Sequence, residues 1–347
     1  MASPHEELPP MVSVVIPTFN GGDWLLEAIA SCRRQGAVAL ELIVVDDAST
    51  DNTPDQVAKH YPEARLIRSI SNSGSGALGR NTGLQLARGR YVKFLDHDDQ
   101  LEPHSLALEV NAAEASNADL VMSRWGDVRT DSQGLHLESS KRVFIPPDPE
   151  RLTEAILRGE KLPYTAAILY RRSYIENQRW DARLTINDDF DWFCRNVAQG
   201  GKIIRCDHVS YYWRLHPLSI QGKQALNRKA FVESAHIKNH IYTAFGNSLE
   251  EQGKLSPYFR TLLAEQLYKN LRILARFNHK ACRRTLSYIR QLKPTFKPDP
   301  AIEQNLAVRT LSSLVGLDIT LYLYRMLMLL PDQMRFRGTH QSYYPMR

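Results

Sequence analysis

The sequence predicts an α/β protein with a mostly parallel sheet flanked by helices, followed by a mainly helical C-terminal region. Short apolar strand patterns alternate with helical patterns in the first part of the chain, and such alternation gives parallel strands joined by crossover helices. Each of these strands is followed by polar residues. Because ligands bind at the carboxyl ends of the strands in such sheets, we expect a site at that edge.

The first three strands and two helices follow from periodicity. Apolar runs at residues 11–16 and 40–45 predict strands, and residues 65–70 are predicted to be a short third strand. A helix after the first strand is predicted by apolar residues at i, i+3, i+4 and i+7, with Asp23 as its cap: Leu25, Ala28, Ile29 and Cys32. Pro54 predicts the first turn of the second helix, capped by one of residues 51–53.

The later elements are predicted in the same way. Helical patterns cover residues 78–87 and 106–115, and strand patterns cover 119–123 and 202–206. A polar hairpin-like stretch runs through residue 134, and residues 165–170 form a small, apolar run. Asn187 is the predicted cap of a helix ended by Gly200 and Gly201. Its predicted apolar face is Phe190, Phe193, Cys194 and Val197.

The stretch from residue 91 to residue 103 lies at the centre of the predicted site. An apolar strand pattern leads there into Asp96, Asp98 and Asp99. If the strand continues, Asp96 and Asp98 share one face. Two such carboxylates repel each other unless a cation lies between them, and Mg²⁺ or Mn²⁺ takes ligands of this kind. A solvated acidic loop is the alternative interpretation.

Two further motifs bear on the site. Asp188 and Asp189 fall in the first turn of the helix after Asn187, where the helix dipole favours negative charge; ordinary capping explains them equally well. Residues 74–79 match G-x-G-x-x-G, but a dinucleotide fingerprint follows the first strand of its fold and this one follows the third. We favour a flexible loop whose glycines let Arg80 approach a pyrophosphate.

Charge divides the chain. Residues 1–222 carry 24 Lys and Arg against 30 Asp and Glu, a net −6, whereas residues 223–347 carry 20 against 8, a net +12. The acidic part suits a metal, and the basic part suits an anionic surface or is simply a solvated helical face. No nucleic-acid-binding motif accompanies the charge, so we expect no nucleic-acid partner.

The cysteines and the N-terminus indicate the compartment. The four cysteines are far apart, without a C-x-x-C pair, and two of them lie on apolar stripes, which indicates reduced residues of a cytoplasmic protein: Cys32, Cys194, Cys206 and Cys282. Residues 1–10 are polar and do not resemble a signal peptide.

Six motifs occur in order, and together they resemble inverting family 2 glycosyltransferases of the GT-A type, which use nucleotide-diphosphate sugars. The motifs lie at residues 17–20, 44–51, 79–83, 94–99, 188–195 and 214–219. The resemblance implies a Rossmann-like sheet and covers about residues 11–222. We therefore expect a polar tail at 1–10, a glycosyltransferase domain at 11–222 and a basic helical region at 223–347.

The resemblance also implies roles for individual residues. Asp189 matches the general base, beside Asp188, a shorter carboxylate that stands where the family has Glu and would orient the site. Asp98 and Asp96 match the pair that binds Mn²⁺ or Mg²⁺, with Asp98 the more direct ligand. The donor would contact residues from several motifs: Pro17, Thr18, Phe19, Asn20, Asp47, Arg80, Asp96 and His216.

The predicted activity is transfer of a sugar to a hydroxyl acceptor on a glycan or a lipid-linked or polysaccharide precursor. A nucleotidyltransferase is the alternative enzyme, although it leaves Asp189 and His216 without a role. A nucleotide-sugar-binding assembly protein without catalysis is the other alternative. The donor sugar, the base and the acceptor are not predicted by these residues.

The last third of the chain contains its most apolar stretch, at residues 311–330. About 20 apolar residues can span a bilayer, but Asp318 and Arg325 would each cost roughly 2.5–3.5 kcal/mol near its centre. We favour a docked or interfacial helix. Peripheral contact of the basic region with the inner face of the membrane is a hypothesis.

Overall fold

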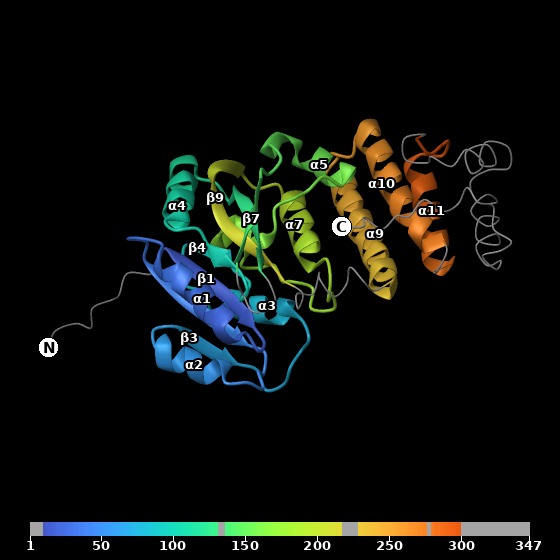
Figure 1. Cartoon of the computed structure of the whole chain (residues 1–347). Helices are drawn as coiled ribbons and strands as arrows, with labels where there is room; N and C mark the ends of the chain where they lie inside the picture. Colours follow the sequence, from blue (N-terminus) through green and yellow to red (C-terminus); the bar gives the residue numbers. More distant parts are fainter. Residues whose placement is uncertain (1–9, 131–135, 217–227, 276–278, 300–347) are drawn as a thin grey trace. The chain divides into compact units, whose positions relative to one another are not determined.

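The computed structural model describes residues 10–130, 136–216, 228–275 and 279–299 (Figure 1). The chain divides into two compact units. The first comprises Met1–Ile156 and Lys161–Leu226, and the second comprises Leu157–Glu160 and Asn227–Arg347.

A nine-stranded sheet organises the described part of the first unit, with strand order β3-β2-β1-β4-β8-β6-β9-β5 and β7 paired to β6. The strands are β1 (Val12–Thr18), β2 (Leu40–Asp46), β3 (Arg65–Arg68), β4 (Tyr91–Phe94), β5 (Gln100–Leu101), β6 (Leu120–Thr130), β7 (His136–Phe144), β8 (Ile168–Arg171) and β9 (Ile203–Leu215).

The pairing confirms the predicted fold class. β1 pairs in parallel with β2 and β4, and β2 pairs in parallel with β3. β8 runs antiparallel to β4 and β6, whereas β6 and β9 are parallel. The sheet is therefore mixed but mostly parallel, and the carboxyl ends of β1, β2 and β4 lie on one edge.

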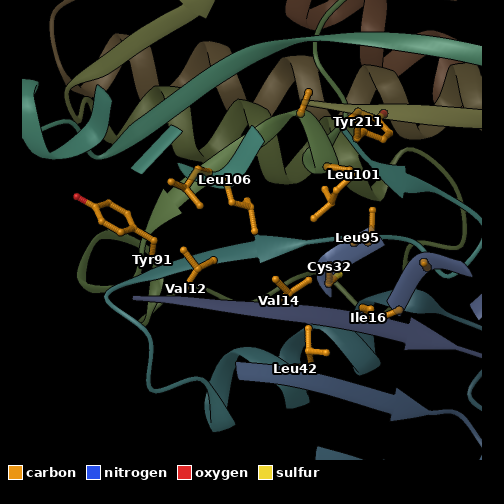
Figure 2. Packing of buried hydrophobic residues seen from close by; sticks show 14 of the residues in the cluster. Val12, Val14, Ile16, Cys32, Leu42, Tyr91, Leu95, Leu101, Leu106 and Tyr211 are labelled. Atoms are coloured by element: carbon orange, nitrogen blue, oxygen red, sulfur yellow. The ribbon is translucent and has the colours of Figure 1, made fainter. Parts of the chain in front are cut away.

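Helices join and cover these strands. They are α1 (Gly22–Arg33), α2 (Thr53–His60), α3 (Gly76–Leu86), α4 (Ser105–Ser116), η1 (Pro149–Arg151), α5 (Leu152–Arg158), η2 (Thr165–Ala167), α6 (Arg172–Ile175) and α7 (Asp188–Gln199). The core lies between sheet and helices. Figure 2 shows Val12, Val14 and Ile16 of β1 in the same buried cluster as Cys32 of α1 and Leu106 of α4.

Glycines let α3 lie close to β1. A Cβ at Gly79 would lie 2.9 Å from the Cβ of Pro17, and one at Gly83 would lie 2.2 Å from Cγ1 of Val15. The second half of the glycine motif is thus explained by helix–strand packing. Gly76, in the first half, leaves room for Arg80, whose Nη1 would lie 2.9 Å from a Cβ there.

Several local expectations were wrong. The strand that leads into residues 96–99, the acidic segment, ends at Phe94. β6 and β9 extend well beyond the predicted ranges 119–123 and 202–206. Asp23 lies inside α1, whose cap is Gly21. Asn52 and Asn187 occupy cap positions, but neither side chain makes a capping hydrogen bond.

The predicted apolar face of α7 needs a correction. Phe193 and Cys194 are buried as expected, whereas Phe190 and Val197 are only partly buried. Trp192, which the pattern omitted, is fully buried. None of the four cysteines, all of them in the described part of the chain, forms a disulfide.

In its described part the second unit contains α9 (Arg228–Glu251), α10 (Pro257–Ala275) and α11 (His279–Leu292), with α10 in contact with both others (Figure 1). Ala235, Leu274 and Ala281 form part of its core. No helix among the described residues has the length and apolarity needed to cross a bilayer. The apolar stretch at residues 311–330 lies outside these residues.

Candidate active site

The acidic segment leaves the sheet at the end of β4 and turns sharply. The Asp99 amide donates to the Asp96 carbonyl across 3.1 Å, with His97 and Asp98 in the turn. The expectation that Asp96 and Asp98 share a strand face is therefore wrong. The two side chains instead contact different partners, Arg80 and His216.

Arg80 joins two segments that are far apart in sequence. From α3, its Nη2 donates to Asp96 Oδ1 across 2.5 Å and its Nη1 donates to Asp188 Oδ2 across 2.9 Å. Its guanidinium carbon lies 4.7 Å from the centroid of the Trp180 ring. Burial alone would lower the pKa of Arg80, but the carboxylates of Asp96, Asp188 and Asp189 outweigh it and raise the pKa. The cation is therefore permanent.

Asp189 follows Asp188 in the first turn of α7, as predicted. Its Oδ1 is shielded from solvent and has no hydrogen-bond partner among the described residues. Burial, and next the charge of Asp188, raise the pKa of Asp189 to about 8, although Arg80 opposes the shift. A carboxyl group with such a pKa is suited to accept a proton near neutral pH.

Asp98 and His216 form the second contact of the site. His216 Nε2 lies 3.0 Å from Asp98 Oδ2, at the end of β9. Burial alone would raise the pKa of Asp98, but the hydrogen bond with His216 and the charge of His97 lower it. Nδ1 of His216 is buried without a partner within the described part of the chain.

Asp99 has a different partner. It is buried, and its Oδ1 accepts the amide of Arg214 across 2.9 Å. Burial and the charge of Asp98 raise the pKa of Asp99 well above its usual value. Asp99 therefore anchors the acidic segment to β9.

The loops after β1, β2 and β3 form the other end of the site. Asp47 Oδ2 accepts from the amide and the hydroxyl of Ser73, each across 2.8 Å. The side chain of Asn20 accepts the Thr50 amide across 2.9 Å. Thr18 Oγ1 is buried without a partner among the described residues, and 41% of Phe19 is exposed.

Contacts within the first unit thus bring the predicted residues into three groups. One contains Arg80, Asp96, Asp188 and Asp189, the second contains Asp98 and His216, and the third contains Asp47 with the first loops. Ser73 links the third group to the first, because its loop leads into α3, which carries Arg80.

The donor atoms fit a divalent cation that is completed by substrate. Among the described residues, no three His, Cys, Asp or Glu side chains converge on one point. Asp98 and Asp96 offer oxygen ligands, and Nδ1 of His216 is unpaired. Mg²⁺ is commonly held by one or two carboxylates together with substrate phosphates, so an incomplete protein ligand set agrees with Mg²⁺ or Mn²⁺.

Sequence reasoning missed Trp180, which stacks on Arg80 and on Trp192, the latter with ring centroids 4.6 Å apart. Trp180 lies outside every motif and outside any helix or strand. Its only signal is a tryptophan in a polar loop, which does not reveal its partner.

The domain carrying these residues matches a known family. A profile described as Glycosyl transferase family 2 covers residues 13–178. The match assigns this segment, just under half of the 347 residues, to glycosyl transferase family 2. The profile contains β1–β4 with the loops and acidic segment that follow them, which confirms the resemblance found in the sequence.

Relatives and solved structures agree with this assignment. The succinoglycan biosynthesis protein ExoO of Rhizobium meliloti (strain 1021) is 31% identical over 227 residues, covering 63% of this chain and 65% of ExoO. The match therefore spans just under two thirds of that relative.

Two solved structures show the GT-A fold. S. aureus TarS 1–349 in complex with UDP-GlcNAc aligns with a TM-score of 0.52 and 18% identity, covering 82% of this chain and 90% of that one. The mannosyltransferase PcManGT from Pyrobaculum calidifontis, in complex with GDP-Man and Mn²⁺, aligns with a TM-score of 0.51 and 18% identity, covering 93% and 90%.

Proposed function

We propose that this chain is a metal-dependent, inverting glycosyltransferase that moves a sugar from a nucleotide-diphosphate sugar to a hydroxyl on a glycan or a lipid-linked precursor. The observation that carries the proposal is Asp189: a shielded carboxyl with a raised pKa, next to Asp188, which Arg80 joins to the acidic segment. Nucleotide sugars in the solved relatives support the donor class.

Asp189 acts as the general base. It takes the proton of the acceptor hydroxyl as that oxygen attacks the anomeric carbon, and the bond from this carbon to the diphosphate breaks on the opposite side. A single displacement inverts the anomeric centre, as in glycosidases that use one carboxylate to activate the incoming oxygen.

Arg80 and the donor-binding loops hold the leaving group. The permanent charge of Arg80 offsets the negative charge that develops on the nucleoside diphosphate. Asp98 and Asp96 would hold a divalent cation, which would supply further stabilisation of the charge on the leaving diphosphate. Asp188 keeps Arg80 in place, Asp47 with Thr18 and Asn20 faces the nucleoside, and Pro17 and Phe19 border it.

The decisive variant is Asp189→Asn, which keeps the shape of the side chain and removes the base. Sugar transfer should fall about 10²–10⁴-fold, while binding of UDP or GDP with Mn²⁺ stays within twofold of the parent. The donor is first identified by hydrolysis of UDP-, GDP- and dTDP-sugars. Unchanged turnover in Asp189→Asn would remove Asp189 from the mechanism.

We also propose a cytoplasmic location with peripheral membrane contact through the basic unit. α11 contains no Asp or Glu, and Arg283, Arg284 and Arg290 are exposed on it. Basic amphipathic helices bind anionic lipid surfaces. Such contact would bring the site to lipid-linked acceptors.

A further inference from the structure

Helix α1 carries a second stripe of side chains beside its apolar one. Trp24, Glu27 and Ser31 lie on it, and Gln35 follows just after the helix ends. The spacing of three, four and four residues places all four on one face. Ser31 and Gln35 are fully buried although they are polar, so their partners are informative.

The C-terminal half of this stripe, Ser31 and Gln35, forms hydrogen bonds with the chain that follows the acidic segment. Ser31 Oγ accepts the Leu101 amide across 3.0 Å. Gln35 Nε2 donates to the Glu102 carbonyl across 2.9 Å, and Gln35 Oε1 accepts the Leu106 amide across 3.0 Å. The backbone next to Asp96, Asp98 and Asp99 is thereby fixed to α1.

The N-terminal half of the stripe, Trp24 and Glu27, contacts the end of β9. Glu27 Oε2 accepts from Gln100 across 2.8 Å and also from Nη2 of Arg214. Trp24 lies with its ring centroid 4.0 Å from that of His216, and Arg214 lies 5.7 Å from the Trp24 ring. Arg214 has only 4% of its side chain exposed, so Glu27 neutralises a buried cation.

We propose that Trp24 and Glu27 are positioning residues that hold His216 against Asp98. The two partners are 118 positions apart in sequence, and α1 contacts the segments that carry both. Trp24 limits the tilt of the imidazole, and Glu27 keeps Arg214 from turning toward the neighbouring carboxylates. The metal part of this inference rests on the proposed function, whereas the positioning part does not.

The first measurement is the imidazole NMR signal of His216 in ¹⁵N-labelled protein, assigned by its loss in His216→Gln. An ionised Asp98 only accepts, so the proton resides on Nε2, where burial slows its exchange with water. We expect the signal in the parent and in Trp24→Phe, and its loss in Trp24→Ala and Glu27→Ala.

The matched control is Glu63→Ala. Glu63 also accepts from an arginine of α1, Arg33, and its side chain is 47% exposed against 48% for Glu27, but it lies outside the site. It should keep the imidazole signal. Thermal unfolding of every variant shows that it is folded, and Glu27→Gln provides a milder change should Glu27→Ala not fold.

The second measurement is the affinity for Mn²⁺ alone, by electron paramagnetic resonance. Loss of groups that orient metal ligands usually weakens metal binding about 10–100-fold, and we expect this in Trp24→Ala and Glu27→Ala but not in Glu63→Ala. An unchanged imidazole signal and unchanged Mn²⁺ affinity would overturn the inference. A parent that does not bind Mn²⁺ contradicts the proposed metal site, while the imidazole signal still decides the positioning role.

Discussion

Asp189 has an unusual balance of charges around it. Asp96, Asp188 and Asp189 surround one guanidinium, that of Arg80, and only the first two bond to it directly. Burial and the charge of Asp188 therefore raise the pKa of Asp189, and the charge of Arg80 offsets this increase only in part. Its proton affinity is raised for a reason visible in the structure, which makes it testable by pH.

The rate of transfer should depend on the ionisation of Asp189. Because Asp189 accepts a proton only when ionised, kcat/KM should rise with pH and level off above an apparent pKa of about 8. Asp188→Asn removes a repelling charge and should therefore shift the rising part of the kcat/KM profile to lower pH. Glu63→Gln should leave the profile unchanged. A profile that is flat from pH 6 to pH 9 would contradict the assignment.

The same pKa predicts a cost in stability. The folded-state pKa of Asp189, about 8, lies above its unfolded value of about 3.9, so ionisation disfavours the folded state progressively as pH rises from 4 to 8. Asp189→Asn should therefore raise the free energy of unfolding by about 0.5–2 kcal/mol at pH 8.5 and by less at pH 5. Urea unfolding at both pH values measures this, and a less stable variant at pH 8.5 would refute it.

For individual residues, the sequence predicts which side chains lie in the site better than it predicts which side chains they contact. Asp188 and Asp189 lie in the first turn of α7 as the capping pattern indicated. Arg80 bonds to Asp188 across 108 positions of sequence and stacks on Trp180, and no local pattern encodes such a contact. The roles of the predicted site residues remain predictions.

Among the elements, β4 and α4 are joined by a buried ion pair. Lys93 Nζ lies 2.8 Å from Glu109 Oε2 and donates to Ser210 across 2.8 Å, and Ser123 donates to Glu109 across 2.8 Å. Both charged side chains are fully buried. Lys93 precedes the acidic segment by three residues, so this network fixes the strand that delivers Asp96.

Breaking this pair should be costly, and replacing it should not. Lys93→Met leaves Glu109 buried without its cation, and we expect a loss of about 3–5 kcal/mol in the free energy of unfolding. The double variant Lys93→Met, Glu109→Leu should recover most of that loss. Urea unfolding of the three proteins tests this; a double variant as unstable as the single one would show that the network is not an isolated pair.

Element order is largely predictable here, and element ends are not. Apolar runs located β1 and β2 because strands covered on both faces are nearly continuous in apolarity, whereas β3 is an edge strand with exposed ends. β9 was predicted to be much shorter, because its polar residues pair with β6 rather than ending the strand. The cap positions of α2 and α7 were predicted, but their side chains make no capping bond.

Across the whole molecule, charge follows the division into units. The net −6 of residues 1–222 and the net +12 of residues 223–347 nearly coincide with the boundary at Leu226 and Asn227. The acidic unit contains the proposed cation and diphosphate site. The basic unit is the one that suits an anionic surface, and composition alone indicated this difference.

The basic unit should bind anionic vesicles. The full chain should sediment with phosphatidylglycerol vesicles at low salt and be released as salt is raised, since each basic residue contributes about 1 kcal/mol at such a surface. Arg283→Glu with Arg290→Glu should weaken binding about tenfold or more, whereas Lys59→Glu on α2 should change it little. Failure of the parent to sediment at low salt would reject membrane contact.

The most direct test of the central claim is the anomeric configuration of the product, read by proton NMR after transfer from the donor that the hydrolysis screen identifies. A single base and a single displacement predict that the new glycosidic bond has the configuration opposite to that in the donor. A product with the donor's configuration would contradict the role given to Asp189 and the mechanism built on it.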